Sequence, residues 1–225
     1  MSGKLIVIDG TDGSGKGTQT DLLIAKLKSE GFKVEKADFP RYGNRSATLV
    51  EEYLNGKFGS ADEVGPYRAS IFYACDRYAA SFEIKNWLNE DKIVVSNRYV
   101  SANMGHQTGK IQDFTERDKF LDWVQNLEFN IFQIPKPDIN VLLYMPPEIG
   151  QKLVDQKGVR DYIGGDRRDI HEDDLNHLKR AADAFAYVAD KYNWININCA
   201  PNGNLLTIEE VHNLLWDKIK AEIKL

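Results

Sequence analysis

The segment "GTDGSGKG", at Gly10–Gly17, is the feature that most constrains how this chain folds. It follows the apolar run "KLIVI" and precedes a stretch with helical periodicity. It matches the pattern G-x-x-x-x-G-K-[ST] except at the last position, where Gly17 stands and Thr18 follows. Glycines at this spacing let backbone N–H groups turn toward phosphate oxygens, and the following helix directs its positive end there. A Gly-rich turn with an incidental lysine is the alternative, and the position between a strand and a helix argues against it.

The residues of this loop have expected roles toward a nucleotide. Lys16 places a positive charge at the β and γ phosphates, and Thr18 is the nearest hydroxyl that could bind Mg²⁺. The expected phosphate-binding residues are Gly10, Gly13, Ser14, Gly15, Lys16, Gly17 and Thr18.

Short apolar runs alternate with longer helical patterns along the rest of the chain. The expected strands lie at residues 4–10, 32–39, 92–99, 138–145 and 194–198. Helical patterns follow the loop up to Gly31, cover Pro66–Asn89 and end the chain from Thr207 onward. This alternation predicts an α/β fold with a mainly parallel sheet of five strands and helices on both faces. The loops after Asp9, Phe39 and Ser96 are expected to converge on one cleft, because such sheets bind ligands beyond the carboxyl ends of their strands.

Composition narrows the class of protein. The net charge of −5 argues against general nucleic-acid binding, which normally needs a basic face. No stretch of apolar residues is long enough to predict a transmembrane helix, and two cysteines without metal-ligand spacing suit a reducing compartment. We therefore expect a cytoplasmic, single-domain protein spanning residues 1–225, with no nucleic-acid or membrane partner.

The remaining motifs separate the classes of protein that use such a loop. The guanine-reading string N-K-x-D is absent, and neither the third nor the fourth expected strand ends in an acidic residue, as a motor ATPase would require. The chain instead carries "FPRYG", "FYACDRY" and "NRYVSAN" in that order. With these motifs it resembles the thymidylate kinases, and most closely a branch with "FPRYG" and "LVEEYLNGKFG". The resemblance implies a P-loop NTPase fold, phosphoryl transfer from Mg-ATP to dTMP to give dTDP, and a homodimer formed by helix packing, with Pro66–Asn89 as the candidate helix.

Several residues are expected to read the base and the sugar. Tyr73 and Arg77 lie four residues apart on one helix, which suits stacking on a pyrimidine and donation to a carbonyl oxygen. The resemblance places Asn103 at the thymine edge, and His106 where some members crowd the 2′ position of the sugar. It places Asp12 at the 3′-hydroxyl of the acceptor. A core tyrosine with a surface arginine, a solvated Asp12 and an ordinary loop histidine are the alternatives.

The acceptor phosphate is assigned to two arginines at adjacent strand ends. Arg41 and Arg98 follow the second and third expected strands, and Phe39 is expected to line the pocket beside them. The family motif D-R-[YH] reads "NRY" here, with Asn97 in place of the aspartate. A phosphate acceptor needs no strong base, whereas a nucleoside hydroxyl does, so this substitution favours a monophosphate acceptor.

An arginine-rich lid is expected at about residues 153–170. Thymidylate kinases carry a catalytic arginine in the phosphate loop or in the lid, and the loop position after Asp12 is Gly13. Arg160 and Arg167 are therefore the leading candidates, with Arg168 and Lys157 nearby; a solvated loop of mixed charge is the alternative. The expected catalytic residues are Lys16, Asp12, Arg98, Arg160 and Arg167. A deoxynucleoside kinase and a non-catalytic nucleotide-binding protein remain as rival functions.

Overall fold

The computed structural model describes residues 3–155 and 175–223. Their strands form one five-stranded sheet in the order β2-β3-β1-β4-β5, and every pairing in it is parallel. The strands are β1 (Lys4–Gly10), β2 (Val34–Asp38), β3 (Ile93–Asn97), β4 (Ile139–Tyr144) and β5 (Ile195–Asn198). The predicted sheet is thus confirmed, with each strand inside its expected range.

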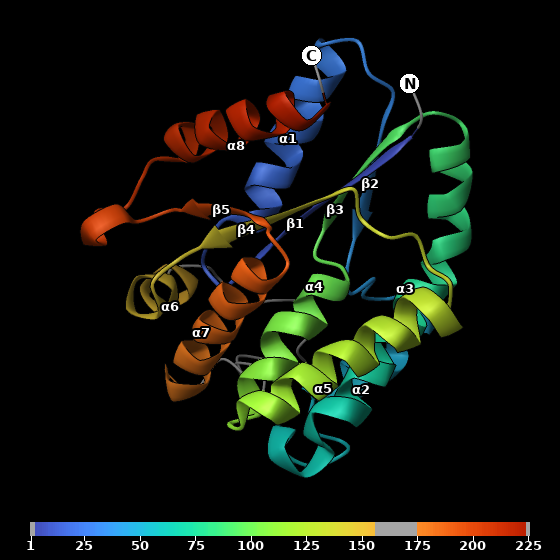
Figure 1. Ribbon diagram of the computed structural model, residues 1–225, viewed down its shortest axis with the longest axis vertical. Helices are drawn as coiled ribbons and strands as arrows, with labels where there is room; N and C mark the ends of the chain where they lie inside the picture. Colours follow the sequence, from blue (N-terminus) through green and yellow to red (C-terminus); the bar gives the residue numbers. More distant parts are fainter. Residues whose placement is uncertain (1–2, 156–174, 224–225) are drawn as a thin grey trace.

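Helices and short helical turns connect the strands (Figure 1). The α-helices are α1 (Lys16–Ser29), α2 (Thr48–Leu54), α3 (Ala61–Asn89), α4 (Val100–Ala102), α5 (Phe114–Gln125), α6 (Pro147–Asp155), α7 (Leu175–Lys191) and α8 (Ile208–Ile223). The tighter 3-10 turns are η1 (Arg45–Ala47), η3 (Thr108–Lys110) and η5 (Pro201–Gly203), and the wider π-helical turns are η2 (Asn103–Gln107) and η4 (Asn126–Ile131).

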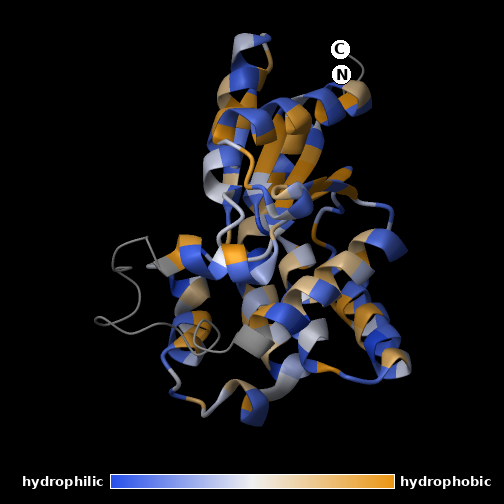
Figure 2. Cartoon of the chain, turned by 90° about the vertical axis from the view of Figure 1, so that its left-hand side faces the viewer, coloured by the Kyte–Doolittle hydropathy of each residue, from blue (hydrophilic) through white to orange (hydrophobic). Residues whose placement is uncertain are grey.

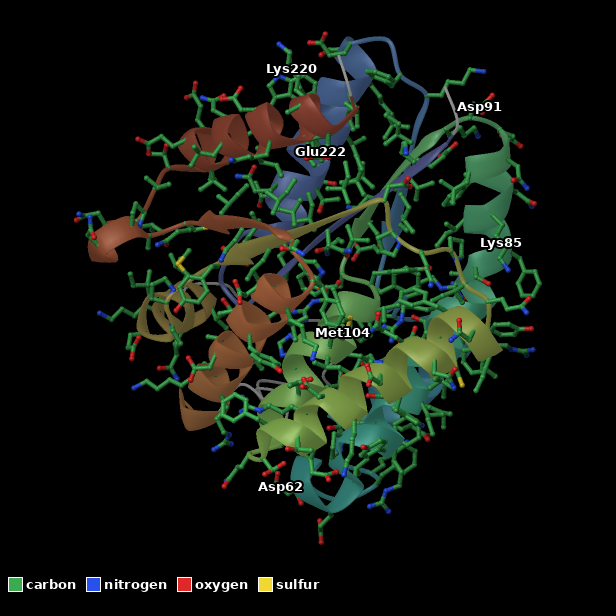
Figure 3. The ribbon with its side chains drawn as sticks, in the orientation of Figure 1. Asp62, Lys85, Asp91, Met104, Lys220 and Glu222 are labelled. Atoms are coloured by element: carbon green, nitrogen blue, oxygen red, sulfur yellow. The ribbon has the colours of Figure 1, made fainter. Side chains whose placement is uncertain are left out.

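The sheet has a separate apolar core on each face, because successive strand residues point to opposite sides. Ile6 and Ile8 of β1 belong to the core that α1 and α8 cover, whereas Leu5 and Val7 belong to the core shared with α3, α5 and α7. Figure 2 shows the apolar strands between helices whose polar residues face outward. In Figure 3, Met104 lies centrally below the sheet, while Asp62, Lys85, Asp91 and Lys220 lie at the periphery.

The longest helix, α3, begins one turn earlier than its sequence pattern predicts. Ser60 accepts a hydrogen bond from the Glu63 amide, and the Glu63 carboxylate accepts one from the Ser60 amide, which caps this first turn. Gly65 has φ 74° and interrupts the helix just before Pro66, from which the predicted helix runs. The prediction from Pro66 onward is therefore correct, and the capped turn is an addition.

Two smaller expectations concern the cysteines and the membrane. Cys75 and Cys199 are both free thiols, and burial raises the pKa of Cys199 to about 11. Among the helices of residues 3–155 and 175–223, none has the length and apolar character needed to cross a membrane.

The loop after β1 packs directly against α6 through two glycines. Gly13 has φ 79°, and a Cβ placed on it would overlap the Gly150 backbone. A Cβ placed on Gly150 would lie 2.5 Å from the carbonyl oxygen of Asp12. Backbone thus meets backbone here, and neither position has room for a side chain unless the two segments move apart.

We expect Gly150→Ala to lower the free energy of unfolding by about 1–3 kcal/mol, because its methyl group overpacks the contact with Asp12. Alanine ordinarily stabilises a helix relative to glycine by about 0.5–1 kcal/mol, so the two effects have opposite signs. Urea unfolding measures the difference, and Lys152→Ala, at an exposed position of α6, is the control. A Gly150→Ala protein more stable than the wild type would contradict the overpacking.

Candidate active site

The loop between β1 and α1 has the form of an anion site. Gly15 is the N-cap of α1, no side chain caps the described helix start, and its first turn contains no acidic residue. The N–H groups of this turn and the helix dipole therefore favour an anion at this end. The Lys16 ammonium donates a hydrogen bond to the carbonyl of Thr11 at 2.7 Å, which holds its charge inside the loop.

An ion pair joins this loop to the end of β3. Arg98 Nη2 donates to Asp12 Oδ1 at 2.7 Å, and Lys16 Nζ lies 3.8 Å from the same oxygen. Arg98 has φ 63°, in the left-handed region that a residue other than glycine adopts at some cost, as at many functional sites. Arg98 Nη1 lies 2.9 Å from His106 Nε2; a guanidinium only donates, so this nitrogen is the acceptor. The structure thus brings three predicted residues, Asp12, Arg98 and His106, together.

A buried carboxylate at the end of β1 completes this group, and the sequence analysis did not identify it. Asp9 accepts hydrogen bonds from Ser101 Oγ at 2.7 Å and from the Gly10 amide at 2.8 Å. Burial raises its pKa, and the charges of Arg98 and Lys16 offset part of that rise. Burial alone would lower the pKa of Arg98, but the carboxylates of Asp12 and Asp9 outweigh it and raise that pKa. Asp9 is the single charged residue after Lys4 in "KLIVIDG", which was the available signal.

The second predicted phosphate ligand, Arg41, is anchored to α3. Its Nε donates to Asp76 Oδ1 at 3.0 Å, its amide donates to Asp76 Oδ2 at 2.8 Å, and its Nη2 donates to Ser46 Oγ at 2.8 Å. Asp76 is buried, whereas the Arg41 side chain is 23% exposed. The neighbouring Tyr42 is close enough to Arg98 to contribute to its pKa, so this loop approaches the end of β3.

Two of the predicted base-reading residues, Arg77 and Asn103, share a buried carboxylate that no sequence motif indicated. Glu128 accepts from Arg77 Nε at 2.6 Å and from Arg77 Nη2 at 2.7 Å. Asn103 Nδ2 donates to the same carboxylate at 3.2 Å. Both Asn103 and Glu128 lie in π-helical turns, a geometry found often at functional sites. Glu128 stands among apolar residues in "NLEFNIF", and a lone acidic residue in such a run was the signal.

The two aromatic residues of the prediction each pack against a tyrosine ring. Tyr73 lies one turn before Arg77 on α3, half-buried, with its ring 6.3 Å from that of Tyr53. Phe39 is buried, and its ring centroid is 5.7 Å from that of Tyr99.

The substituted position of the D-R-[YH] motif has an acidic neighbour. Asn97 and Asp38 are paired at the ends of β3 and β2, and Asn97 Nδ2 donates to Asp38 Oδ1 at 2.8 Å. The carboxylate missing at position 97 is therefore present on the adjacent strand.

The lid prediction falls largely outside the described residues. Lys157, Arg160, Arg167 and Arg168 all lie there, and only the segment up to Asp155 belongs to α6. Thr18, the predicted metal ligand, is an exposed residue in the first turn of α1.

Comparisons with known proteins identify the family of this chain. The family model described as thymidylate kinase matches residues 8–215. A thymidylate kinase of Mycobacterium tuberculosis is 32% identical over 187 residues, which cover 82% of this chain and 85% of that protein. The thymidylate kinase of Plasmodium falciparum is 26% identical over 223 residues, covering 98% of this chain and 92% of its own length.

A solved structure supports the fold independently. The thymidylate kinase of Candida albicans superposes with a TM-score of 0.74 at 22% identity, covering 99% of this chain and 93% of that one. With the family model matched from β1 to α8, the chain belongs to the thymidylate kinase family.

Proposed function

We propose that this enzyme transfers the γ-phosphoryl group of ATP to the phosphate of dTMP, forming dTDP and ADP. The ion pair between Asp12 and Arg98 carries the proposal, because it joins the donor-phosphate loop to the strand end that offers an arginine to a second phosphate. Membership of the thymidylate kinase family supports dTMP as the acceptor. An oxygen of the acceptor phosphate forms the new bond to the γ-phosphorus while the bridging oxygen of ATP leaves with ADP.

The residues around the acceptor position it and offset its charge. Arg98 and Arg41 hold the acceptor phosphate, each oriented by a carboxylate, Asp12 for the first and Asp76 for the second. Asp12 is placed to accept from the sugar 3′-hydroxyl once the acceptor is bound, and His106 borders the sugar. No general base is needed, since phosphoryl transfer depends mostly on position and charge.

Magnesium is assigned to the donor side of this site. Mg²⁺ commonly binds through one or two protein oxygens together with phosphates and water, so a dedicated acidic cluster is not required. The described residues hold no group of three or more metal-ligating side chains, and the exposed Thr18 hydroxyl at the start of α1 fits the smaller requirement. The ion would offset negative charge between the β and γ phosphates.

A lid arginine completes the proposed machinery. The loop position after Asp12 offers no room for one, because a side chain on Gly13 would overlap the Gly150 backbone. This observation supports Arg160 or Arg167, on the segment that follows α6, as the source of the catalytic charge. The two free thiols support a cytoplasmic location.

The acceptor assignment predicts a difference between dTMP and thymidine. We expect ADP release with dTMP and little with thymidine, and Arg98→Gln should raise the KM for dTMP roughly 30- to 100-fold because a charge-assisted contact with phosphate is lost. Arg45→Gln, at an exposed position in η1, is the control. Turnover of thymidine alone would identify a nucleoside kinase. Binding of both nucleotides without product would identify a non-catalytic protein.

The pairing of Asn97 with Asp38 predicts that the family aspartate is unfavourable in this chain. We expect Asn97→Asp to lower the free energy of unfolding by about 0.5–1 kcal/mol at pH 7, because a carboxylate replaces the donor that faces Asp38. Combining it with Asp38→Asn exchanges the two groups and should recover the loss. Urea unfolding of the wild type and of the single and double variants measures these differences. Equal free energies of unfolding for all of these proteins would refute the pairing of Asn97 with Asp38.

We further propose that the enzyme is a homodimer that packs through α3. Ile71, Tyr78 and Phe82 recur on one side of this helix and are 40%, 42% and 55% exposed. Ile131 of η4 is 63% exposed, and Tyr78 contacts Phe132 of the same region, so the apolar stripe continues onto η4. Contiguous exposed apolar surface of this kind commonly marks a protein–protein interface.

Light scattering after gel filtration tests the dimer. The wild-type protein should have twice the chain mass of 25.6 kDa, and Phe82→Glu should shift it toward the monomer because the charge would be buried. Phe114→Glu changes another exposed phenylalanine, 62% exposed on α5, and should leave the mass unchanged. A monomeric wild type would exclude the dimer.

A further inference from the structure

Glu128 is a fully buried carboxylate with three hydrogen bonds from two side chains. Its partners are Arg77, which donates from Nε and Nη2, and Asn103, which donates from Nδ2. Arg77 is itself 1% exposed, and Asn103 is 2% exposed. The two polar side chains proposed to bind the base, Arg77 and Asn103, therefore both donate to one buried carboxylate.

This arrangement fixes which end of the Asn103 amide is available. Asn103 Nδ2 donates to the Ser70 carbonyl at 3.1 Å and to Glu128 Oε1 at 3.2 Å. Both neighbours are acceptors only, so the reverse orientation would place the amide oxygen against two other oxygens. Asn103 thus keeps Oδ1 as its unused group; no hydrogen bond within the described part of the chain engages it.

The same carboxylate fixes the plane of the Arg77 guanidinium. Two of its nitrogens point at Glu128, and among the described residues no hydrogen bond is made by the third, Nη1. The unused groups of the pair are consequently one donor, on Arg77, and one acceptor, on Asn103. Rotation of either side chain would break bonds to Glu128.

A donor and an acceptor held by one carboxylate can discriminate between pyrimidines. Thymine and uracil present an acceptor, O4, beside a donor, N3–H, which complements this pair. Cytosine presents a donor, the 4-amino group, beside an acceptor, N3, which opposes donor with donor and acceptor with acceptor. Buried mismatches of this kind reject a ligand far more strongly than the loss of apolar contact.

We propose that Glu128 is the positioning residue that sets base specificity, by holding Arg77 as a donor and Asn103 as an acceptor toward the pyrimidine. The inference rests on the proposed function of Arg77 and Asn103 as base ligands. In this proposal Glu128 acts through Arg77 and Asn103, its hydrogen-bond partners, and not by contact with the base or the reacting atoms. Replacing a buried ion pair by apolar residues often leaves a protein as stable or more stable, so the triad is poorly explained by stability alone.

Glu128→Gln tests the proposal. In either orientation of the new amide, its NH₂ group faces a donor of Arg77 or Asn103, so at least one of them loses its fixed position. We expect the KM for dTMP to rise roughly 10- to 100-fold, with kcat changed less than about threefold, and the preference for dTMP over dCMP in kcat/KM to fall at least about tenfold. Asp118→Asn removes a carboxylate from α5 that pairs with Lys191, and it should change neither quantity.

Glu128→Asp keeps the buried negative charge and serves if Glu128→Gln fails to fold. Its shorter side chain retains a charge for Arg77 but withdraws from Asn103, whose bond is already the longest of the three. The preference for dTMP over dCMP should fall here too, with a melting temperature close to that of the wild type. Folded Glu128 variants that keep the wild-type preference, even with reduced kcat, would overturn the proposal.

The variant Asn103→Ala distinguishes a failure of the role proposed for Glu128 from a failure of the base-ligand assignment itself. If its preference and its KM for dTMP are unchanged, Asn103 is not a base ligand and the site assignment fails. If Asn103→Ala loses the preference while the Glu128 variants keep it, the assignment stands and the role of Glu128 alone fails.

Discussion

The ion pair between Asp12 and Arg98 links the two halves of the active site. Asp12 belongs to the loop after β1, and Arg98 follows β3, its neighbour in the sheet. The pair forms because parallel strands end at the same edge, and the left-handed backbone of Arg98 is tolerated within that contact. In the proposed function this ion pair brings the binding residues for the donor and acceptor phosphates together before any ligand binds, and such preorganisation is what phosphoryl transfer requires.

In the proposed function, helix α3 is the spacer between the acceptor phosphate and the base. Two consecutive residues of opposite charge, Asp76 and Arg77, point to different sides of the helix. Asp76 pairs with Arg41, the proposed phosphate ligand, and Glu128 pairs with Arg77, the proposed base ligand. Both ion pairs have at least one fully buried partner, so movement of α3 would expose an unpaired charge to an apolar surrounding. In that assignment, one rigid element sets the distance between the two ends of the proposed substrate site.

Local patterns in the sequence predicted the five strands of this fold and three of its helices, α1, α3 and α8, whereas several candidate ligands came from the family resemblance. The five strands, the phosphate loop and the face of α3 that carries Tyr73 and Arg77 all follow from periodicity and short motifs. The partners of those ligands did not follow, because pairing depends on contacts between distant segments. Arg77 and Glu128 are 51 positions apart, and no local pattern in either segment predicts that these two residues form an ion pair.

Other features of the site could not be predicted from the sequence for the same physical reason. Asp9 is an acidic residue inside an apolar strand. Its carboxylate accepts a hydrogen bond from Ser101, which lies 92 positions away in the sequence. The π-helical turns that carry Asn103 and Glu128 arise from packing and have no sequence signature comparable to a capping box. The lid arginines Arg160 and Arg167, and the FPRYG branch within the family, stay predictions.

The central claim is that dTMP lies between Arg98 and the pair formed by Arg77 and Asn103, with its phosphate toward the phosphate loop. A crystal structure with dTMP and a non-hydrolysable ATP analogue tests it most directly. The account predicts the dTMP phosphate on Arg98 and Arg41, thymine O4 on Arg77, and thymine N3–H on Asn103 with Glu128 still behind both. A dTMP molecule bound with its base away from α3, or with its phosphate out of reach of Arg98, would contradict it.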